Sequence, residues 1–251
     1  MPTVWLRPLQ LLVELFLPDG CRACGTYLPM SDGPWCAACA LKIGRAAQTD
    51  YCPRCGITSQ QANQADGCPL CMNTPWPIDG VARVGEYSGT LRELIHRYKF
   101  RKQQLLDRPL GQLLVSAVQR HPWHVELDGL VPVPTSWKSR REYGCSPATS
   151  IAQQMSRDLR VPMLPILRER GKKLRQVGLD AAKRAKNVRG VYEIAPSARP
   201  AGGIFCIVDD VSTSGATLRE IATVLRKANA TRVYAAVLAK TPIGHDDAHD
   251  L

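Results

Sequence analysis

The segment Ile204-Phe-Cys-Ile-Val-Asp-Asp-Val-Ser-Thr-Ser-Gly-Ala-Thr217 is the most informative part of this 251-residue chain. Its first five residues are all apolar, which is typical of a strand buried on both faces of a parallel sheet. Asp209 and Asp210 follow at the carboxyl end of that strand, where α/β folds bind ligands. The small, hydroxyl-rich run 213–217 leads directly into a helical pattern, so it can offer N–H groups, hydroxyls and a helix dipole to a phosphate.

Further strands and helices are predicted on both sides of this segment. Residues 232–238 form an apolar run at the distance expected for a strand–helix–strand unit. Upstream, the hydrophobic patterns predict strands over 81–87 and 129–134 and helices over 91–100, 105–119 and 146–159. Alternating strands and helices predict an α/β domain with a mostly parallel central sheet flanked by helices.

The acid pair and the loop resemble the ribose-5-phosphate signature of type I phosphoribosyltransferases, which use phosphoribosyl pyrophosphate (PRPP). Ser212 stands where the signature usually has an aliphatic residue. The resemblance implies that Asp209 and Asp210 are catalytic and hold the ribose hydroxyls, directly or through Mg2+, while the loop cradles the 5-phosphate. The implied PRPP-binding residues are Asp209, Asp210, Val211, Ser212, Thr213, Ser214, Gly215, Ala216 and Thr217.

The plainer alternative is a capped strand end with two solvated aspartates. Adjacent carboxylates on a buried strand destabilise each other unless a cation or a hydroxyl meets them. That cost favours a ligand site.

Eight cysteines form four regularly spaced C-x2-C pairs in the first third of the chain: Cys21, Cys24, Cys36, Cys39, Cys52, Cys55, Cys68 and Cys71. Gly25 and Gly56 follow the first and third pairs, which is typical of the tight turn in a zinc knuckle. Two knuckles supply the four thiolates of a closed, structural zinc site, so two zinc ions are expected. Sequential pairing of the knuckles and a cross-braced arrangement are both open.

Disulfides, redox chemistry and an iron–sulfur cluster are alternatives for these cysteines. Disulfides suit exported proteins, and the sequence has no export signal. Redox chemistry of the thioredoxin kind needs one C-x2-C in a strand–helix–strand setting. Four thiolates also bind iron, so the cluster stays an alternative to zinc.

Charge divides the chain into two parts. Residues 1–80 have five Lys and Arg against six Asp and Glu, whereas residues 81–251 have 28 against 16. The segment 168–189 has nine Lys and Arg against two acids. Together with the cysteine pairs and the resemblance to the PRPP signature, this division leads us to expect an amphipathic helix over 1–18, a double zinc-ribbon module over 19–78, a phosphoribosyltransferase-like domain over 79–243 and a polar tail over 244–251.

The whole pattern is similar to the ComF family of competence and DNA-utilisation proteins. The shared motifs are the cysteine ribbon, Leu91-Arg-Glu-Leu-Ile-His-Arg-Tyr-Lys-Phe100, Val131-Pro-Val-Pro134, the residues Gln176, Arg184, Asn187 and Gly190, and the PRPP signature. The resemblance implies a phosphoribosyltransferase-like protein that uses PRPP and serves DNA uptake, with an unspecified acceptor. The sequence departs from the family at Arg140-Arg-Glu-Tyr-Gly-Cys-Ser146, where the family usually has Arg-Gly-Phe-Asn-Gln-Ser.

The basic segment 168–189 has three interpretations. In type I phosphoribosyltransferases a loop near this position closes over the pyrophosphate, and cations there stabilise the leaving group. Our candidates for this catalytic role are Lys172, Lys173, Arg175 and Arg184. Alternatively, the segment lines a groove for single-stranded DNA with Arg92, Arg97, Lys99, Arg101 and Lys102, where Tyr98, Phe100 or Trp137 stacks on bases. A solvated basic surface is the third interpretation.

The sequence also leads to expectations for the cellular compartment and the function. The apolar run 4–17 is too short to span a bilayer and contains charges, so we expect a cytoplasmic protein without a transmembrane span. The leading hypothesis is a transferase that binds PRPP with Mg2+ and serves DNA uptake. The alternatives are an inactive single-stranded-DNA-binding accessory of the uptake machinery and a PRPP-sensing regulator.

Overall fold

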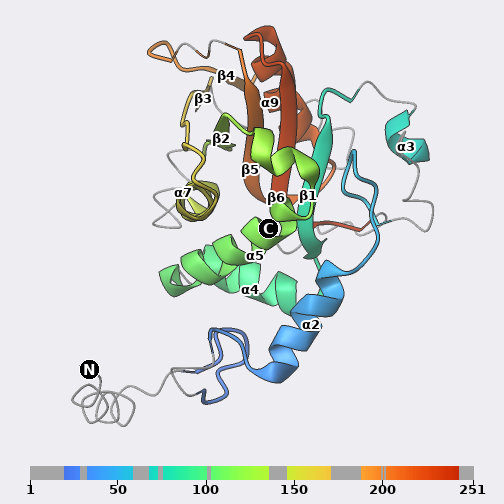
Figure 1. Cartoon of the computed structure of the whole chain (residues 1–251), viewed down its shortest axis with the longest axis vertical. Helices are drawn as coiled ribbons and strands as arrows, with labels where there is room; N and C mark the ends of the chain where they lie inside the picture. Colours follow the sequence, from blue (N-terminus) through green and yellow to red (C-terminus); the bar gives the residue numbers. More distant parts are fainter. Residues whose placement is uncertain are drawn as a thin grey trace.

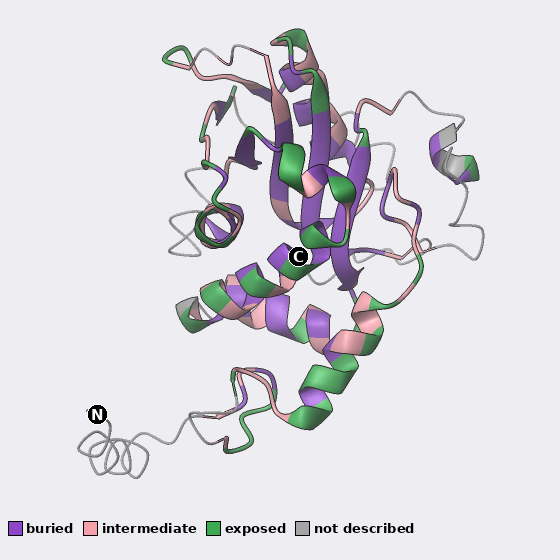
Figure 2. Ribbon diagram, viewed as in Figure 1, coloured by how far each residue is buried: buried purple, intermediate pink, exposed green. Residues whose placement is uncertain are grey.

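A four-stranded parallel sheet forms the centre of the computed structural model (Figure 1). The structure describes residues 20–28, 33–58, 68–72, 76–100, 103–135, 146–170, 188–198, 200 and 202–242. The strand order is β1-β6-β5-β2, with β1 at Gly80–Glu86, β6 at Arg232–Lys240, β5 at Ile204–Ser212 and β2 at Gly129–Pro132. The two central strands have the longest apolar runs because each is covered on both faces (Figure 2).

Helices cover both faces of this sheet. One face packs against α4 (Gly89–Phe100), α5 (Asp107–Gln119) and α7 (Pro147–Leu159). The other packs against α9 (Ala216–Lys227) and an antiparallel pair made by β3 (Leu167–Glu169) and β4 (Tyr192–Ile194). Short 3-10 helices at Gln104–Leu106 and Pro122–Glu126 precede α5 and β2. This is the predicted α/β architecture.

The predicted elements are confirmed, with one informative difference. The strand predicted over residues 204–208 continues to Ser212, since Val211 and Ser212 still pair with Ala239 and Lys240 of β6. Asp209 and Asp210 therefore lie within β5 and not beyond its end. The predicted helix over 1–18 and the tail over 244–251 lie outside the described residues.

The cysteine-rich region packs directly on the sheet domain. Cys21, Ala23 and Cys39 belong to the same apolar core as α4 and α5, and Nη1 of Arg97 donates to the carbonyl of Ala23 at 2.6 Å. The helix α2 (Ala37–Ala47) follows Cys36, and α3 (Pro69–Met72) carries Cys71.

Both outer strands of the sheet have backbone partners on their outward sides. The N–H of Val81 in β1 donates to the carbonyl of Pro53 at 2.7 Å, and Pro53 lies between Cys52 and Cys55. Leu130 in β2 bonds to Pro162 and Leu164. In the described part of the chain, no helix is both long enough and apolar enough to span a membrane.

Candidate functional site

The acid pair lies on β5 next to the end of α4. Successive residues in a strand point to opposite faces, so the two carboxylates face different neighbours. Nζ of Lys99, one residue before the end of α4, is 3.0 Å from Oδ2 of Asp210, and the two side chains are only 18% and 10% exposed. Burial lowers the pKa of Lys99, but the carboxylates of Asp210 and Asp209 outweigh it, so the pKa is raised. Lys99 is therefore the cation that meets the acid pair.

Asp209 faces Tyr192 on the other side of the sheet. Tyr192 is buried on β4, and burial together with the charges of Asp209 and Glu169 raises the pKa of its hydroxyl, while a hydrogen bond with Thr217 opposes the shift. Tyr192 thus links the acid pair to the last residue of the loop. Tyr192 was not predicted as a site residue, and Lys99 was predicted only as part of the DNA groove.

The loop 213–217 turns at its glycine. Gly215 has φ 74° and is the N-cap of α9, so the backbone turns there in a way that a side chain disfavours. The hydroxyl of Ser214 accepts a hydrogen bond from the N–H of Ala216 at 3.4 Å. The loop therefore places N–H groups and hydroxyls at the positive end of a twelve-residue helix, which is an arrangement suited to an anion.

The carboxylates have the oxygen donors that Mg2+ prefers. Asp210 is already paired with Lys99, so a magnesium ion at the pair would bind through Asp209 or would have to displace the ammonium group from Asp210. The donor chemistry fits the metal, and the ion pair determines which carboxylate is accessible to it.

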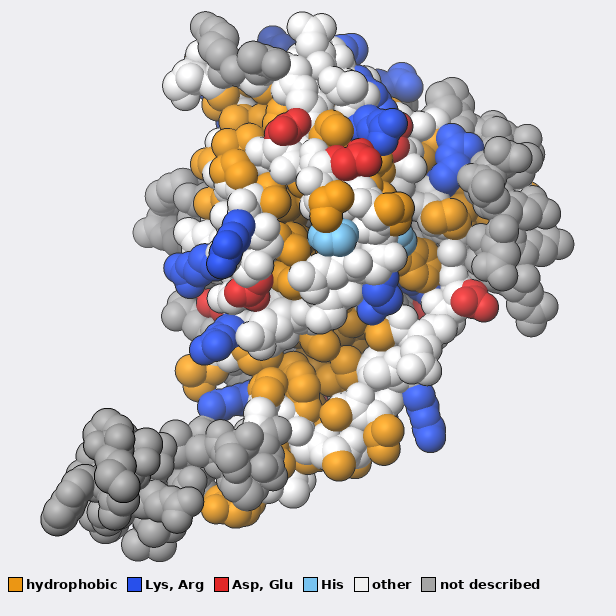
Figure 3. Space-filling view, viewed as in Figure 1, with side chains coloured by type: hydrophobic (Ala, Val, Ile, Leu, Met, Phe, Trp, Pro, Cys, Tyr) orange, Lys and Arg blue, Asp and Glu red, His pale blue; other side chains and the backbone are white. Residues whose placement is uncertain are grey.

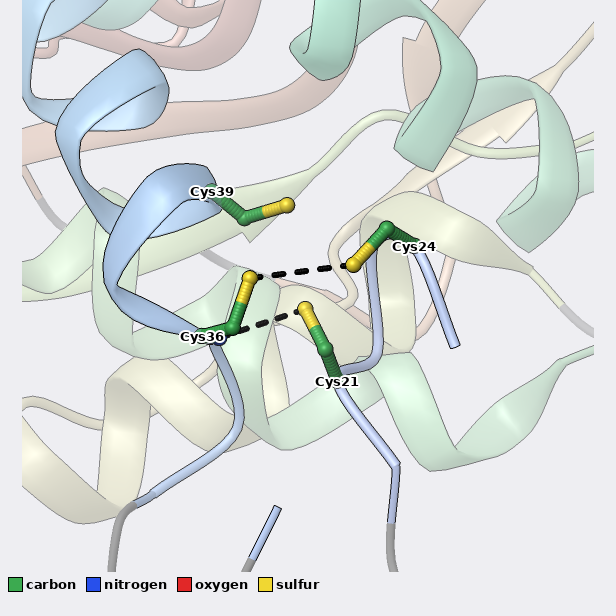
Figure 4. Close-up of side chains that lie close together, drawn as sticks. All are labelled: Cys21, Cys24, Cys36 and Cys39. Atoms are coloured by element: carbon green, nitrogen blue, oxygen red, sulfur yellow. Dashed lines mark hydrogen bonds between the residues drawn. The ribbon is translucent and has the colours of Figure 1, made fainter. Parts of the chain in front are cut away.

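The cysteines form two clusters by sequential pairing, which removes the cross-braced alternative. Cys21, Cys24, Cys36 and Cys39 make the first cluster (Figure 4), and Cys52, Cys55, Cys68 and Cys71 make the second. In each cluster all four Sγ atoms lie within 4.8 Å of one another. Thiolates 2.3 Å from a tetrahedral zinc ion are about 3.8 Å apart. The Sγ atoms of Cys24 and Cys36 are 3.7 Å apart and those of Cys55 and Cys68 are 3.5 Å apart, so both clusters suit zinc.

In each cluster hydrogen bonds favour the thiolate of one cysteine, whereas burial raises the pKa of Cys39 to about 12 and that of Cys71 to about 11. The hydroxyl and amide of Thr26 lower the pKa of Cys24 to about 6. The thiol of Cys55 and several backbone N–H groups lower the pKa of Cys52 to about 4. The N–H of Cys68 donates to Sγ of Cys52 at 3.2 Å, as expected for a knuckle.

Two buried cations lie near the second cluster. Arg83 and Lys240 are 1% and 2% exposed. Burial lowers the pKa of both, to about 8 for Lys240. Glu86, Tyr51 and then Cys55 oppose the shift in pKa for Arg83, and Cys55 opposes it for Lys240. Four thiolates around one Zn2+ have a net charge of −2, which would compensate two buried cations. This charge balance is a second reason to assign a tetrathiolate metal to the cluster.

Comparisons with known proteins agree with this geometry. Residues 144–250 match the family model described as the phosphoribosyl transferase domain. Competence protein F of Haemophilus influenzae is 33% identical over 168 residues, which cover 64% of this chain and 73% of that protein. The chain belongs to the ComF family.

Alignments with other relatives cover nearly the whole of this ComF-family chain. DNA utilization protein YhgH of Escherichia coli O6:H1 is 29% identical over 234 residues, which cover 90% of this chain and 99% of that protein. Glutamine PRPP amidotransferase from B. subtilis, solved with ADP and GMP, is 26% identical with a TM-score of 0.36, over 53% of this chain and 26% of its own. The fold is that of a type I phosphoribosyltransferase preceded by a zinc-ribbon type of cysteine module.

The basic residues predicted to meet pyrophosphate, Lys172, Lys173, Arg175 and Arg184, lie outside the described residues of this ComF-family chain, as does the departure at 140–145. Both ends of the segment that holds them are described. On one side β3 leads into it, and on the other the N–H of Gly190 donates to Oε1 of Glu220 in α9 at 2.6 Å. Gly190, which follows the segment in the chain, is therefore held against the helix that begins at the phosphate loop.

Several residues predicted to line the DNA groove are buried or have partners within the protein. Tyr98 is wrong as a base-stacking residue because its side chain is 0% exposed and its hydroxyl donates to Asp107. Lys99 pairs with Asp210, and Arg97 bonds to Ala23 and Gln103. The positions of Arg101, Lys102 and Trp137 and the side chain of Phe100 lie outside the described part. On the face in Figure 3, the described Lys and Arg side chains are scattered.

Proposed function

We propose that this ComF-family protein binds PRPP with Mg2+ and transfers its phosphoribosyl group in DNA uptake or utilisation. The observation that carries the proposal is the acid pair of β5, which lies directly before a positive-φ loop at the start of α9, inside a matched phosphoribosyl transferase domain. The names of the relatives, Competence protein F and DNA utilization protein YhgH, support the cellular role.

Each part of the site has a role in this proposal. The loop 213–217 binds the 5-phosphate, and Asp209 and Asp210 bind the ribose hydroxyls directly or through Mg2+. During transfer the bond from C1 of the ribose to pyrophosphate breaks, a new bond forms from C1 to the acceptor nucleophile, and pyrophosphate leaves with the electron pair. The cations at 172, 173, 175 and 184 stabilise that leaving group.

We also propose that each cysteine cluster holds a structural zinc ion. All four positions of each ion are filled by thiolates, so zinc stabilises the fold and has no open position for catalysis. Reduced thiols of this kind suit the cytoplasm, which is the compartment we propose.

Calorimetry with PRPP and Mg2+ tests the proposal. We expect heat of binding from the wild-type protein and at least tenfold weaker binding by the Asp209→Asn/Asp210→Asn variant, since each hydrogen bond to a charged group contributes roughly 1.5–3 kcal/mol. Glu126→Gln is a matched control because this exposed carboxylate pairs with Arg232 at the opposite end of β6. An absence of heat from the wild type would refute PRPP binding.

A pyrophosphate assay separates transfer from sensing. Release of pyrophosphate with an acceptor supports the transferase. Tight PRPP binding without release for any acceptor favours the regulator that only senses PRPP.

Single-stranded DNA binding is the second candidate, and the names of the relatives favour it. It predicts an association constant that falls steeply with salt, by roughly 0.7 log units per log unit of salt for each neutralised phosphate. Charge reversal at Lys172, Lys173 and Arg175 should flatten that slope by about 2 in fluorescence anisotropy titrations. Reversal of the exposed residues Lys42, Arg45 and Arg157 is the matched control. A flat slope for the wild type would contradict a DNA groove.

A further inference from the structure

A buried lysine supports the phosphate loop from the sheet side. Lys240 is the last residue of β6, and its Nζ donates to Oγ of Ser212 at 3.3 Å and to the carbonyl of Thr213. Ser212 is the residue that replaces an aliphatic side chain in the PRPP signature, and its hydroxyl is the acceptor that the buried ammonium needs. A charged group at 2% exposure is tolerated only with such partners. Lys240 thus fixes the start of the loop.

A tryptophan supports the middle of the same loop. A Cβ atom on Gly215 would lie 3.0 Å from Cη2 of Trp76 and 3.8 Å from Nζ of Lys240. Gly215 is therefore in contact with the indole ring. The guanidinium of Arg219, in the first turn of α9, lies 5.5 Å from the centre of that ring.

Trp76 also contacts the second cysteine cluster. Its side chain packs against the four buried cysteines, and its Nε1 donates to the carbonyl of Arg54 at 2.7 Å. Arg54 lies inside the knuckle between Cys52 and Cys55, so a metal held by these two cysteines fixes the carbonyl that Trp76 binds. Among the described residues, the first cluster packs against α4 instead, through Arg97 and Ala23.

We propose that Trp76 and Lys240 are positioning residues that couple the second cysteine cluster to the phosphate loop. Metal in the second cluster then orders the loop for its anion, and an anion on the loop slows loss of that metal. Thermodynamic coupling between two sites is reciprocal. The first cluster has no part in this coupling. The effect of an anion on metal loss rests on the proposed binding of PRPP. The contacts of Trp76 and Lys240 with the loop do not depend on that binding.

Zinc release from the full chain tests the coupling without any ligand. With a chromophoric chelator, we expect Trp76→Phe and Lys240→Met each to speed release of one of the two zinc ions about tenfold and to leave the other unchanged. Phe205→Leu is the control, because this buried aromatic side chain lies near the start of β5, beside Gly129 and Gly203 and at the opposite end of the strand from the phosphate loop. If both ions leave the Trp76→Phe variant at wild-type rates, the coupling is refuted. Trp76→Phe also covers the case in which Lys240→Met does not fold.

Ribose 5-phosphate extends the test to the ligand. Saturating ribose 5-phosphate should slow release of one zinc ion about tenfold in the wild type and have no effect on either ion in Trp76→Phe. Heat of binding without any change in zinc release would overturn the coupling and leave the proposed function intact. Faster zinc release from the two variants, with no heat from ribose 5-phosphate or PRPP, would refute the proposed function and support the coupling.

Discussion

Serine in place of Cys52 is expected to remove one zinc ion from the protein and to lower its thermal unfolding midpoint by about 10 °C. Cys52 is fully buried, its Sγ accepts the N–H of Cys68, and its knuckle bonds to β1 through Pro53. Loss of a structural metal is among the few single changes that remove several kcal/mol of stability. Mass spectrometry of the native protein and differential scanning calorimetry measure the two effects.

Two other cysteines provide controls for this variant. Cys206→Ser introduces the same chemical change at a buried cysteine of β5 outside both clusters, so the zinc content should stay at two ions with a smaller fall in the midpoint. Cys24→Ser should remove the other ion. A Cys52→Ser protein that still holds two zinc ions would show that the second cluster is not a zinc site.

Methionine in place of Lys99 is expected to destabilise the ligand-free protein by about 2–3 kcal/mol, because it leaves the carboxylate of Asp210 largely buried without its cation. The double variant Lys99→Met/Asp210→Asn should regain most of that loss, since no unpaired charge remains. Urea unfolding of the wild type, both single variants and the double variant measures this coupling.

The unfolding midpoint in the presence of Mg2+ gives a second test with the Lys99→Met variant. Mg2+ alone should raise the unfolding midpoint of Lys99→Met more than that of the wild type, because the metal can take the place of the lost ammonium beside Asp210. An equal response of both proteins to Mg2+ would contradict a cation site at the acid pair.

The local part of the fold could be predicted from the sequence because each element carries its own signal. The unbroken apolar run of β5 predicts a buried parallel strand, and the small, hydroxyl-rich run before α9 predicts a phosphate-binding loop. The end of β5 could not be predicted in this way, because its last residues are held by pairing with β6. The strand order also depends on packing between distant segments.

The sequence indicates the part of the candidate site that is contiguous in the chain, and it does not indicate the contacts made from distant elements. Asp209, Asp210 and the loop are neighbours in the chain, whereas Lys99, Tyr192, Trp76 and Lys240 reach them from separate elements. Sequential pairing of the cysteines also needed the structure, since regular spacing fits both arrangements. The burial of Tyr98 had a signal: it follows Leu91, Leu94 and Ile95 at helical spacing, which places it on the core face of α4.

The hydrogen bond from Val81 to Pro53 has a further consequence. It places the knuckle of the second cysteine cluster on the outward side of β1, so this edge of the apolar sheet is shielded from pairing with a strand of another molecule. Zinc depletion would free this edge while the rest of the sheet is still folded. Metal-starved protein should therefore self-associate through β1 and be lost to aggregation before it unfolds.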